Sequence, residues 1–286
     1  MASTKTQDLD YNDREQALEI IKRFKKKYLH DNIEELKDFS FWYILTDEEF
    51  NGVSFDGTMF DGDRTRIVYA IDKLLYDKKE IPDFKLGPEG NYTGDTINTF
   101  RTLFGNRFKI QDGKNGEEQV EEKFYFDEKL KKDKNNFFWT YQTIGNFYIL
   151  PTVSGKSINK LRGTNRWKDY FDIFIENLDL CLKDSEEKDK TLDSYLHEDI
   201  YRNFFKKFKF EDDSFLRLYY LSKYKNFKYP HPNKDVLCGH NNYSNKYISE
   251  KEYVDFAFYY IQKATELIND RSMQIVNFLK DIKELR

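Results

Sequence analysis

The chain has 286 residues with 26 Phe and 21 Tyr, enough ring surface for the core of one large or two ordinary domains, which argues against a disordered chain. Its formal net charge of −4 lacks the basic excess of a dedicated nucleic-acid binder, so any nucleic-acid contact must be local. Two cysteines, Cys181 and Cys238, are too few for a disulfide framework and fit a reducing cytoplasm.

The N-terminal region predicts helices joined by turns. The run that begins at Asn12 repeats apolar residues at helical spacing, namely Ala17, Ile20, Ile21, Phe24 and Tyr28. Residues 39–45 form an aromatic run that fits either a strand or a buried helical turn. Asp63 stands where an N-cap belongs, ahead of a second apolar face made by Ile67, Ala70, Ile71, Leu74 and Leu75.

Aspartates paired with glycines lie between these two helices, at Asp56, Asp61 and Asp63. Carboxylate oxygens are the ligands that hard cations prefer, but the spacing differs from that of an EF-hand loop. Asp-Gly pairs are also typical of tight turns. We favour turns here and expect no bound metal and no cofactor.

Residues 79–92 are rich in glycine and proline and are expected to form a loop. Asp95 or Thr96 then caps a predicted helix that ends at Gly105, and Asn98 and Arg101 lie three apart beside one face of it. The following charged stretch favours a surface insertion, with a β-hairpin as the small β element. The predicted domains are a helical part with aspartate/glycine turns at 1–110, a charged insertion at 111–136 and a C-terminal helical part at 137–286, with one continuous domain as the alternative.

The central stretch, residues 137–165, is the least ambiguous part of the chain. An apolar run ends at Pro151, and five cations follow with no acid between them: Lys156, Lys160, Arg162, Arg166 and Lys168. Asn159, Asn165 and Trp167 are interleaved with them. Pairing with the chain's own acids is favoured over an acidic protein surface, and nucleic acid comes third. The segment 154–157 resembles the end of a phosphate loop but has Leu150 where the first glycine is needed.

The C-terminal part predicts further helices, and the last one is the longest. Ser249 and Glu252 match a capping box, and the apolar face includes Tyr260, Ile261, Ala264, Ile268, Ile275, Leu279 and Ile282. Such a helix is long for one globular core, so we expect it to protrude and to support a homo-oligomer. The predicted fold class is α+β, predominantly α-helical, with a small β element and this long C-terminal helix.

Histidines are scarce where chemistry is expected. The chain has His30, His197, His231 and His240, and none between residues 31 and 196. The central stretch therefore has no local imidazole for acid/base catalysis. His231, Cys238 and His240, with a fourth ligand from elsewhere, match no common zinc spacing, and an ordinary loop is favoured.

Several blocks of the sequence resemble a family of uncharacterised bacterial and phage proteins. They are GDTINTF, YQTIGNFYILP, SINKLRG and the closing I-N-D-R-S-M-Q-I-V pattern, and the resemblance covers roughly residue 94 to the end. Residues 144–150 also resemble the I-G-N-L-x-x-L segment of His-Asn-His nucleases from modification-dependent restriction systems. Those nucleases need a histidine shortly upstream, where this chain has Phe138, Trp139, Thr140 and Tyr141. The resemblance implies a role in conflict between phages and their hosts.

These observations favour a non-catalytic, cytoplasmic protein that binds another protein, such as an inhibitor or subunit of an anti-phage defence complex. A nucleic-acid-binding or phosphodiester-cleaving enzyme is the alternative. No stretch reaches the roughly 18 apolar residues of a membrane span, so no membrane partner is expected. The candidate binding residues are Asp95, Asn98, Arg101, Asn146, Lys156, Asn159, Arg162, Arg166 and Trp167.

Overall fold

The computed structural model of the chain describes residues 13–44, 47, 49–50, 65–77, 91–92, 108–112, 118–122, 137, 139–147, 149–150, 152–153, 156–157, 178–197, 214–224 and 250–286. These residues are mostly helical. The α-helices are α1 (Arg14–Tyr28), α2 (Arg66–Asp77), α7 (Lys190–Leu196), α9 (Ser214–Leu218) and α11 (Glu250–Asp281). The 3-10 helices are η1 (Ile33–Lys37), η2 (Phe41–Ile44), η4 (Ile144–Asn146) and η6 (Lys283–Leu285).

Helix α1 forms where the apolar spacing predicts it. The Asp13 carboxylate caps its first turn by accepting hydrogen bonds from the amides of Glu15 (2.8 Å) and Gln16 (3.4 Å). Its predicted stripe is buried at Ala17, Ile20, Ile21 and Phe24. The helix stops before His30 and Asp31, which both take positive φ.

The apolar face predicted for the second helix is likewise confirmed in α2, where Ile67, Ala70, Ile71, Leu74 and Leu75 are buried. Asp63, its predicted cap, lies outside the described residues. The choice left open for residues 39–45 is resolved for 41–44, which form the 3-10 helix η2. Phe41 and Ile44 of this helix are buried.

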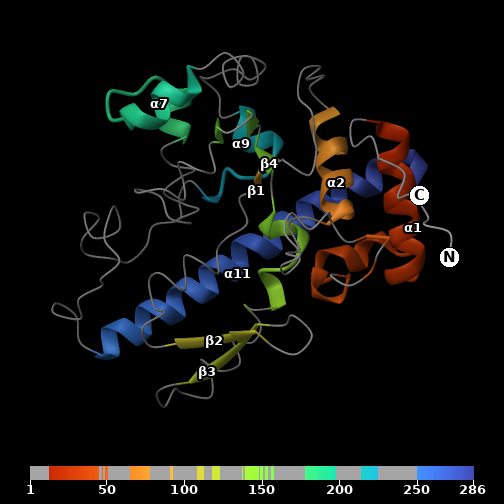
Figure 1. Cartoon of the computed structure of the whole chain (residues 1–286), viewed down its shortest axis with the longest axis horizontal. Helices are drawn as coiled ribbons and strands as arrows, with labels where there is room; N and C mark the ends of the chain where they lie inside the picture. The colour runs from red at the N-terminus through yellow and green to blue at the C-terminus, as the bar shows by residue number, and fades with distance from the viewer. Residues whose placement is uncertain are drawn as a thin grey trace, which may run out of the picture.

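Helix α11 confirms the long C-terminal helix. Its 32 residues span about 48 Å at 1.5 Å per residue. It crosses the described structure, and its C-terminal end lies beside α1 (Figure 1). Two contacts made by the residues after α11 fix that end: Lys25 Nζ donates to the Leu285 carbonyl at 3.0 Å, and Arg14 lies 3.5 Å from Glu284.

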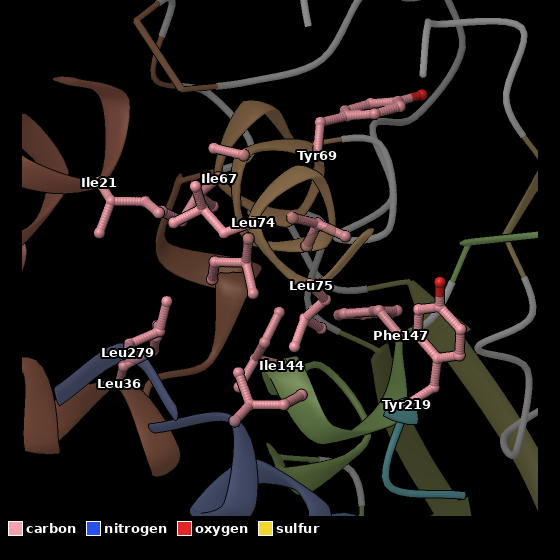
Figure 2. Close-up of a cluster of buried hydrophobic side chains, with 14 of the residues drawn as sticks. Ile21, Leu36, Ile67, Tyr69, Leu74, Leu75, Ile144, Phe147, Tyr219 and Leu279 are labelled. Carbon is pink, nitrogen blue, oxygen red and sulfur yellow. The ribbon is translucent and has the colours of Figure 1, made fainter. Parts of the chain in front are cut away.

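One hydrophobic core joins the two ends of the chain. Side chains from α1, η1, α2, η4 and α11 point toward one another in Figure 2, among them Ile21, Leu36, Leu74, Ile144 and Leu279. Burial of these side chains, at about 25 cal/mol per Å² of apolar surface, holds α11 against the N-terminal helices. The boundaries predicted at residues 110 and 136 stay a prediction, and described helices on both sides of them share this core.

Three short antiparallel strand pairs accompany the helices. β1 (Asn91–Tyr92) pairs with β4 (Ile149–Leu150), β2 (Phe108–Asp112) with β3 (Glu118–Glu122), and β5 (Thr152–Val153) with β6 (Lys156–Ser157). Because most described residues lie in helices and the strands are short, the predominantly helical character is confirmed. The finer α+β class stays a prediction. Among the described helices, none is long and apolar enough to cross a membrane.

Candidate functional site

Within the central stretch, residues 139–147 form a tight turn that is buried on α11. Backbone hydrogen bonds from Tyr141 N to Phe137 O (2.9 Å), Thr143 N to Thr140 O (2.9 Å) and Asn146 N to Thr143 O (3.0 Å) close it. Residues 140–147 are all buried. We call residues 139–147 the anchored turn, because α11 holds it in the two ways described next.

The first anchor is the close approach of Gly145 to the α11 backbone. The Gly145 amide donates to Ser272 Oγ at 2.9 Å. A Cβ at Gly145 would lie 1.9 Å from the Ile268 carbonyl oxygen and 2.8 Å from the Ser272 nitrogen. Both atoms belong to the α11 backbone, which cannot move aside locally. Glycine is required here for packing.

The second anchor is the guanidinium of Arg271, which is fully buried. Its Nη1 donates to the carbonyls of Gly145 (3.0 Å) and Phe147, and weakly to that of Ile144 (3.4 Å). Its Nε donates to the Tyr219 carbonyl at 2.9 Å. A buried charge is tolerated when hydrogen bonds replace its water, and here backbone carbonyls do so. Arg271 thus ties the anchored turn to the segment after α9.

Asp72 of α2 is the acid whose charge is coupled to Arg271. It is buried, and no described residue gives its Oδ2 a hydrogen bond. Burial raises the pKa of the Asp72 carboxyl to about 8, although the positive charge of Arg271 lowers it. At neutral pH this carboxyl is therefore mostly protonated, and the backbone carbonyls are the main partners of the guanidinium.

Asn146 is the one predicted binding residue whose side chain the structure describes. It is buried, and its Nδ2 donates to the Tyr141 carbonyl at 2.7 Å, which closes the anchored turn internally. Lys156 has its backbone paired with Val153. The remaining predicted residues lie outside the described part of the chain: Asp95, Asn98, Arg101, Asn159, Arg162, Arg166 and Trp167. Their role in binding stays a prediction.

An exposed aromatic pair lies where the anchored turn meets η2. The rings of Tyr43 and Trp139 stand edge to face with centroids 5.0 Å apart, and they are 59% and 37% exposed. Trp139 Nε1 donates to the Asp38 carbonyl at 3.2 Å, which fixes the indole. The Phe41 amide donates to the Gln142 carbonyl at 2.8 Å and joins the two segments. We call Tyr43 and Trp139 the aromatic pair.

Sequence reasoning missed both Arg271 and the aromatic pair. A signal existed for Arg271, because it falls between Ile268 and Ile275 on the predicted apolar stripe, where a charged residue needs buried partners. No comparable signal marks the aromatic pair. Its two residues are 96 positions apart in a chain rich in aromatics.

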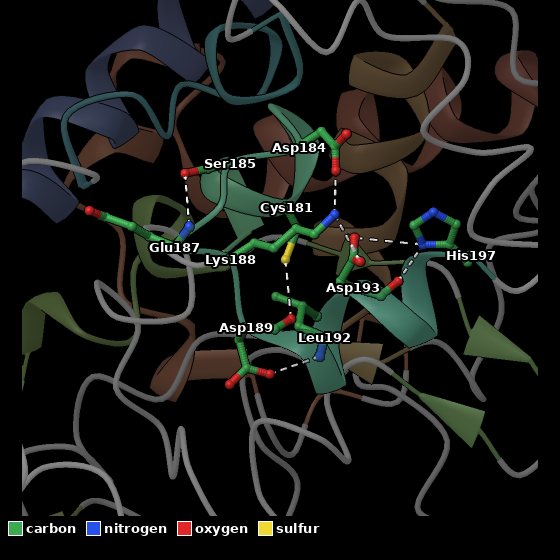
Figure 3. Close-up of polar contacts among 9 residues, drawn as sticks. All are labelled: Cys181, Asp184, Ser185, Glu187, Lys188, Asp189, Leu192, Asp193 and His197. Carbon is green, nitrogen blue, oxygen red and sulfur yellow. Dashed lines mark hydrogen bonds and ion pairs between the residues drawn. The ribbon is translucent and has the colours of Figure 1, made fainter.

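A second polar cluster occupies residues 181–197, a loop followed by α7 (Figure 3). Lys188 Nζ contacts the carboxylates of Asp184 and, at 3.1 Å, Asp193, which also lies 3.6 Å from His197 Nδ1. Cys181 Sγ donates to the Asp189 carbonyl at 3.7 Å. Burial raises the pKa of the Cys181 thiol to about 12, so it is a poor nucleophile. These contacts fit a surface loop held by ion pairs.

The zinc hypothesis falls largely outside the described chain. His231, Cys238 and His240 lie in an undescribed segment, and the described residues contain no His, Cys, Asp and Glu grouping that could hold a metal.

Comparisons of the chain with protein-family models, curated proteins and solved structures find no match.

Proposed function

We propose that the chain is a non-catalytic protein-binding module that acts in phage–host conflict, as an inhibitor or subunit of an anti-phage defence complex. One example would be a phage anti-defence protein that blocks a defence nuclease complex. The observation that supports the binding role is the aromatic pair, two exposed rings on a scaffold fixed by buried contacts. The conflict setting rests on the resemblance of the sequence blocks to bacterial and phage proteins.

Exposed rings on a rigid base suit protein recognition for two reasons. Tyr and Trp are over-represented among the residues that dominate binding energy at protein interfaces. A ring that is already fixed loses little conformational freedom when a partner covers it. The hydrogen bond from Trp139 Nε1 to Asp38 and the buried base of the anchored turn provide that order before binding.

Four residues of the matched sequence blocks serve the fold itself in this proposal, two in the anchored turn and two in α11. Gly145 and Asn146 are used inside the fold, and Arg271 and Ser272 hold them on α11. The I-G-N-F block and the closing R-S-M-Q block therefore meet in space as scaffold. In this proposal the partner meets the exposed rings of Trp139 at the start of the turn and of Tyr43 in η2.

The test is capture from a phage-infected bacterial host. A tagged chain is expected to retain one protein stoichiometrically, and a Tyr43→Ala/Trp139→Ala variant is expected to lose it. Met273→Ala is the matched control, because Met273 is 50% exposed on α11. Retention by the double variant would refute the role of the aromatic pair.

The nucleic-acid alternative predicts a different result. It requires salt-sensitive retention of DNA and metal-dependent cleavage by the purified chain, both abolished by Arg162→Ala. Such turnover would replace the binding proposal with an enzyme. Stable protein capture without hydrolysis would support the binding proposal.

A further inference from the structure

We propose that the aromatic pair receives a cationic side chain, foremost arginine, from a basic segment of the partner protein. This inference rests on the proposed protein-binding function and names the chemistry of the partner. Four features carry it: the open ring surfaces, the occupied indole donor, the acidic segment beside the rings and the polar surroundings of the other exposed apolar side chains.

The ring surfaces suit a cation. An edge-to-face pair presents a face of one ring beside the edge of the other, and both rings here are partly open to solvent. The face of Trp is the best aromatic acceptor for an ammonium or guanidinium group, within about 6 Å of the ring centroid. The Trp139 Nε1–H is already bonded to Asp38, so a partner is left with the ring face and not the donor.

The segment next to the rings is acidic. Residues Ile33–Asp38 hold three carboxylates, Glu34, Glu35 and Asp38, against one lysine, a formal charge of −2. Glu34 contacts Lys280 and Glu35 contacts His30. The Asp38 side chain is 76% exposed, and its ion pair with Lys37 Nζ is long, at 3.9 Å. A cation over Trp139 would therefore have an accessible carboxylate on the residue that already binds the indole.

This charge arrangement favours a basic protein segment over a nucleic acid as the partner. A single-stranded nucleic acid would also stack on Trp139, but its phosphates need basic side chains around the ring. Here the adjoining segment has three carboxylates and one lysine, Lys37. Among the described residues, the other exposed large apolar side chains are Tyr259 and Met273 of α11. Exposed polar residues of that helix, such as Glu266 and Asn269, share its outer face, and no aromatic pair involves Tyr259 in the described part of the chain.

The test follows the indole Nε1–H signals of the three tryptophans by ¹H–¹⁵N correlation NMR, with Trp139→Phe assigning the signal of interest. The probes are blocked tetra-arginine, tetra-lysine and tetra-glutamate peptides and a short oligothymidylate. We expect tetra-arginine to shift the Trp139 signal saturably, tetra-lysine less, and tetra-glutamate and oligothymidylate not at all. Asp38→Asn, which keeps the carbonyl bound to the indole, should weaken tetra-arginine binding about three- to tenfold.

Two results would overturn the inference. One is the lack of a saturable Trp139 shift with tetra-arginine in a chain whose circular dichroism shows it folded. The other is a shift that tetra-glutamate or oligothymidylate reproduces, or that Asp38→Asn leaves unchanged. Tyr259→Leu should not change the titration. Failure here with partner capture intact would refute only the cationic chemistry, whereas peptide binding without any captured protein would refute the proposed function.

Discussion

Arg271 is the residue on which the anchored turn depends. Its guanidinium donates to backbone carbonyls of three residues in or beside η4 and to that of Tyr219, all in a buried setting. A side chain without these donors leaves several buried carbonyl oxygens with fewer partners. Such a loss costs more than the removal of one exposed ion pair.

We therefore predict that Arg271→Met destabilises the fold by roughly 3 kcal/mol or more. Arg271→Lys should not restore stability, because an ammonium is a point donor and cannot reproduce the planar fork. The measurement is urea unfolding followed by circular dichroism. The control is Lys280→Ala, which removes an exposed contact with Glu34 and should change stability little. Equal effects of the two substitutions would contradict this role for Arg271.

Gly145 gives a second prediction at this scale. Gly145→Ala places a methyl group 1.9 Å from the Ile268 carbonyl oxygen, so η4 must move away from α11. We expect a loss of at least about 2 kcal/mol in the free energy of unfolding, measured in the same way. Asn269→Ala, on the exposed face of α11, is the comparison and should change it by less than about 0.5 kcal/mol. A fully stable Gly145→Ala would show that the close approach is not present.

Asp72 makes stability depend on pH. The folded-state pKa of its carboxyl is about 8, well above the ordinary value, so the folded protein binds a proton that the unfolded chain releases. Its contribution is therefore complete below about pH 4, declines as the pH rises from there, and is lost by about pH 8. The amide of Asp72→Asn cannot ionise, so the stability of this variant lacks the decline with pH that Asp72 causes.

The check is the melting temperature of both proteins between pH 5 and pH 9. We expect the melting temperature of the variant, relative to that of the wild type, to increase steadily up to about pH 8. Above that pH the difference should stay constant. Taking the difference between the two curves cancels the other titrating groups. A difference that does not vary with pH would mean that Asp72 is ionised in the folded protein at all these values.

At the scale of elements, η4 and α11 behave as one unit. Ser272 Oγ accepts the Gly145 amide at 2.9 Å and lies 3.4 Å from the Thr143 hydroxyl. Ser272→Ala should therefore speed hydrogen exchange of the Gly145 amide about tenfold, since one buried hydrogen bond is lost. Exchange within α1 should not change. Ser185→Ala is the matched control, because Ser185 Oγ accepts the Glu187 amide in an exposed loop, and it should leave Gly145 unaffected.

The sequence predicted helices correctly where apolar residues recur at helical spacing on one face. Ala17, Ile71 and Ile268 all lie on predicted apolar stripes, and all are buried. It failed for contacts that join distant segments, because Arg271 and Gly145 are 126 residues apart and no local pattern relates them. Asn146 is a predicted binding residue of the I-G-N-F block, and its buried bond to Tyr141 could not be read from the sequence.

At the scale of the whole molecule, the two ends of the chain form one core. α1 and α2 pack together, and α11 contacts η1 and η4. The outward face of α11 holds Gln262, Glu266, Asn269 and Asn277, which favours contact with water. The homo-oligomer through this helix stays a prediction.

The same arrangement supports the aromatic pair from the core. Phe41 of η2 packs on Phe147, with ring centroids 5.9 Å apart, beneath the segments that carry Tyr43 and Trp139. The pair therefore stands on the core and not on a free loop. Substitution of its exposed rings should alter binding without unfolding the chain.

The most direct test is the dissociation constant of the captured partner for the wild type and for Tyr43→Ala/Trp139→Ala, measured by isothermal titration calorimetry. Loss of two ring contacts at the centre of an interface should raise Kd at least about 100-fold, while the melting temperature stays within a few degrees. Tyr259→Ala/Met273→Ala should bind as the wild type does. A Kd within about threefold of the wild type for the Tyr43→Ala/Trp139→Ala variant would contradict the account.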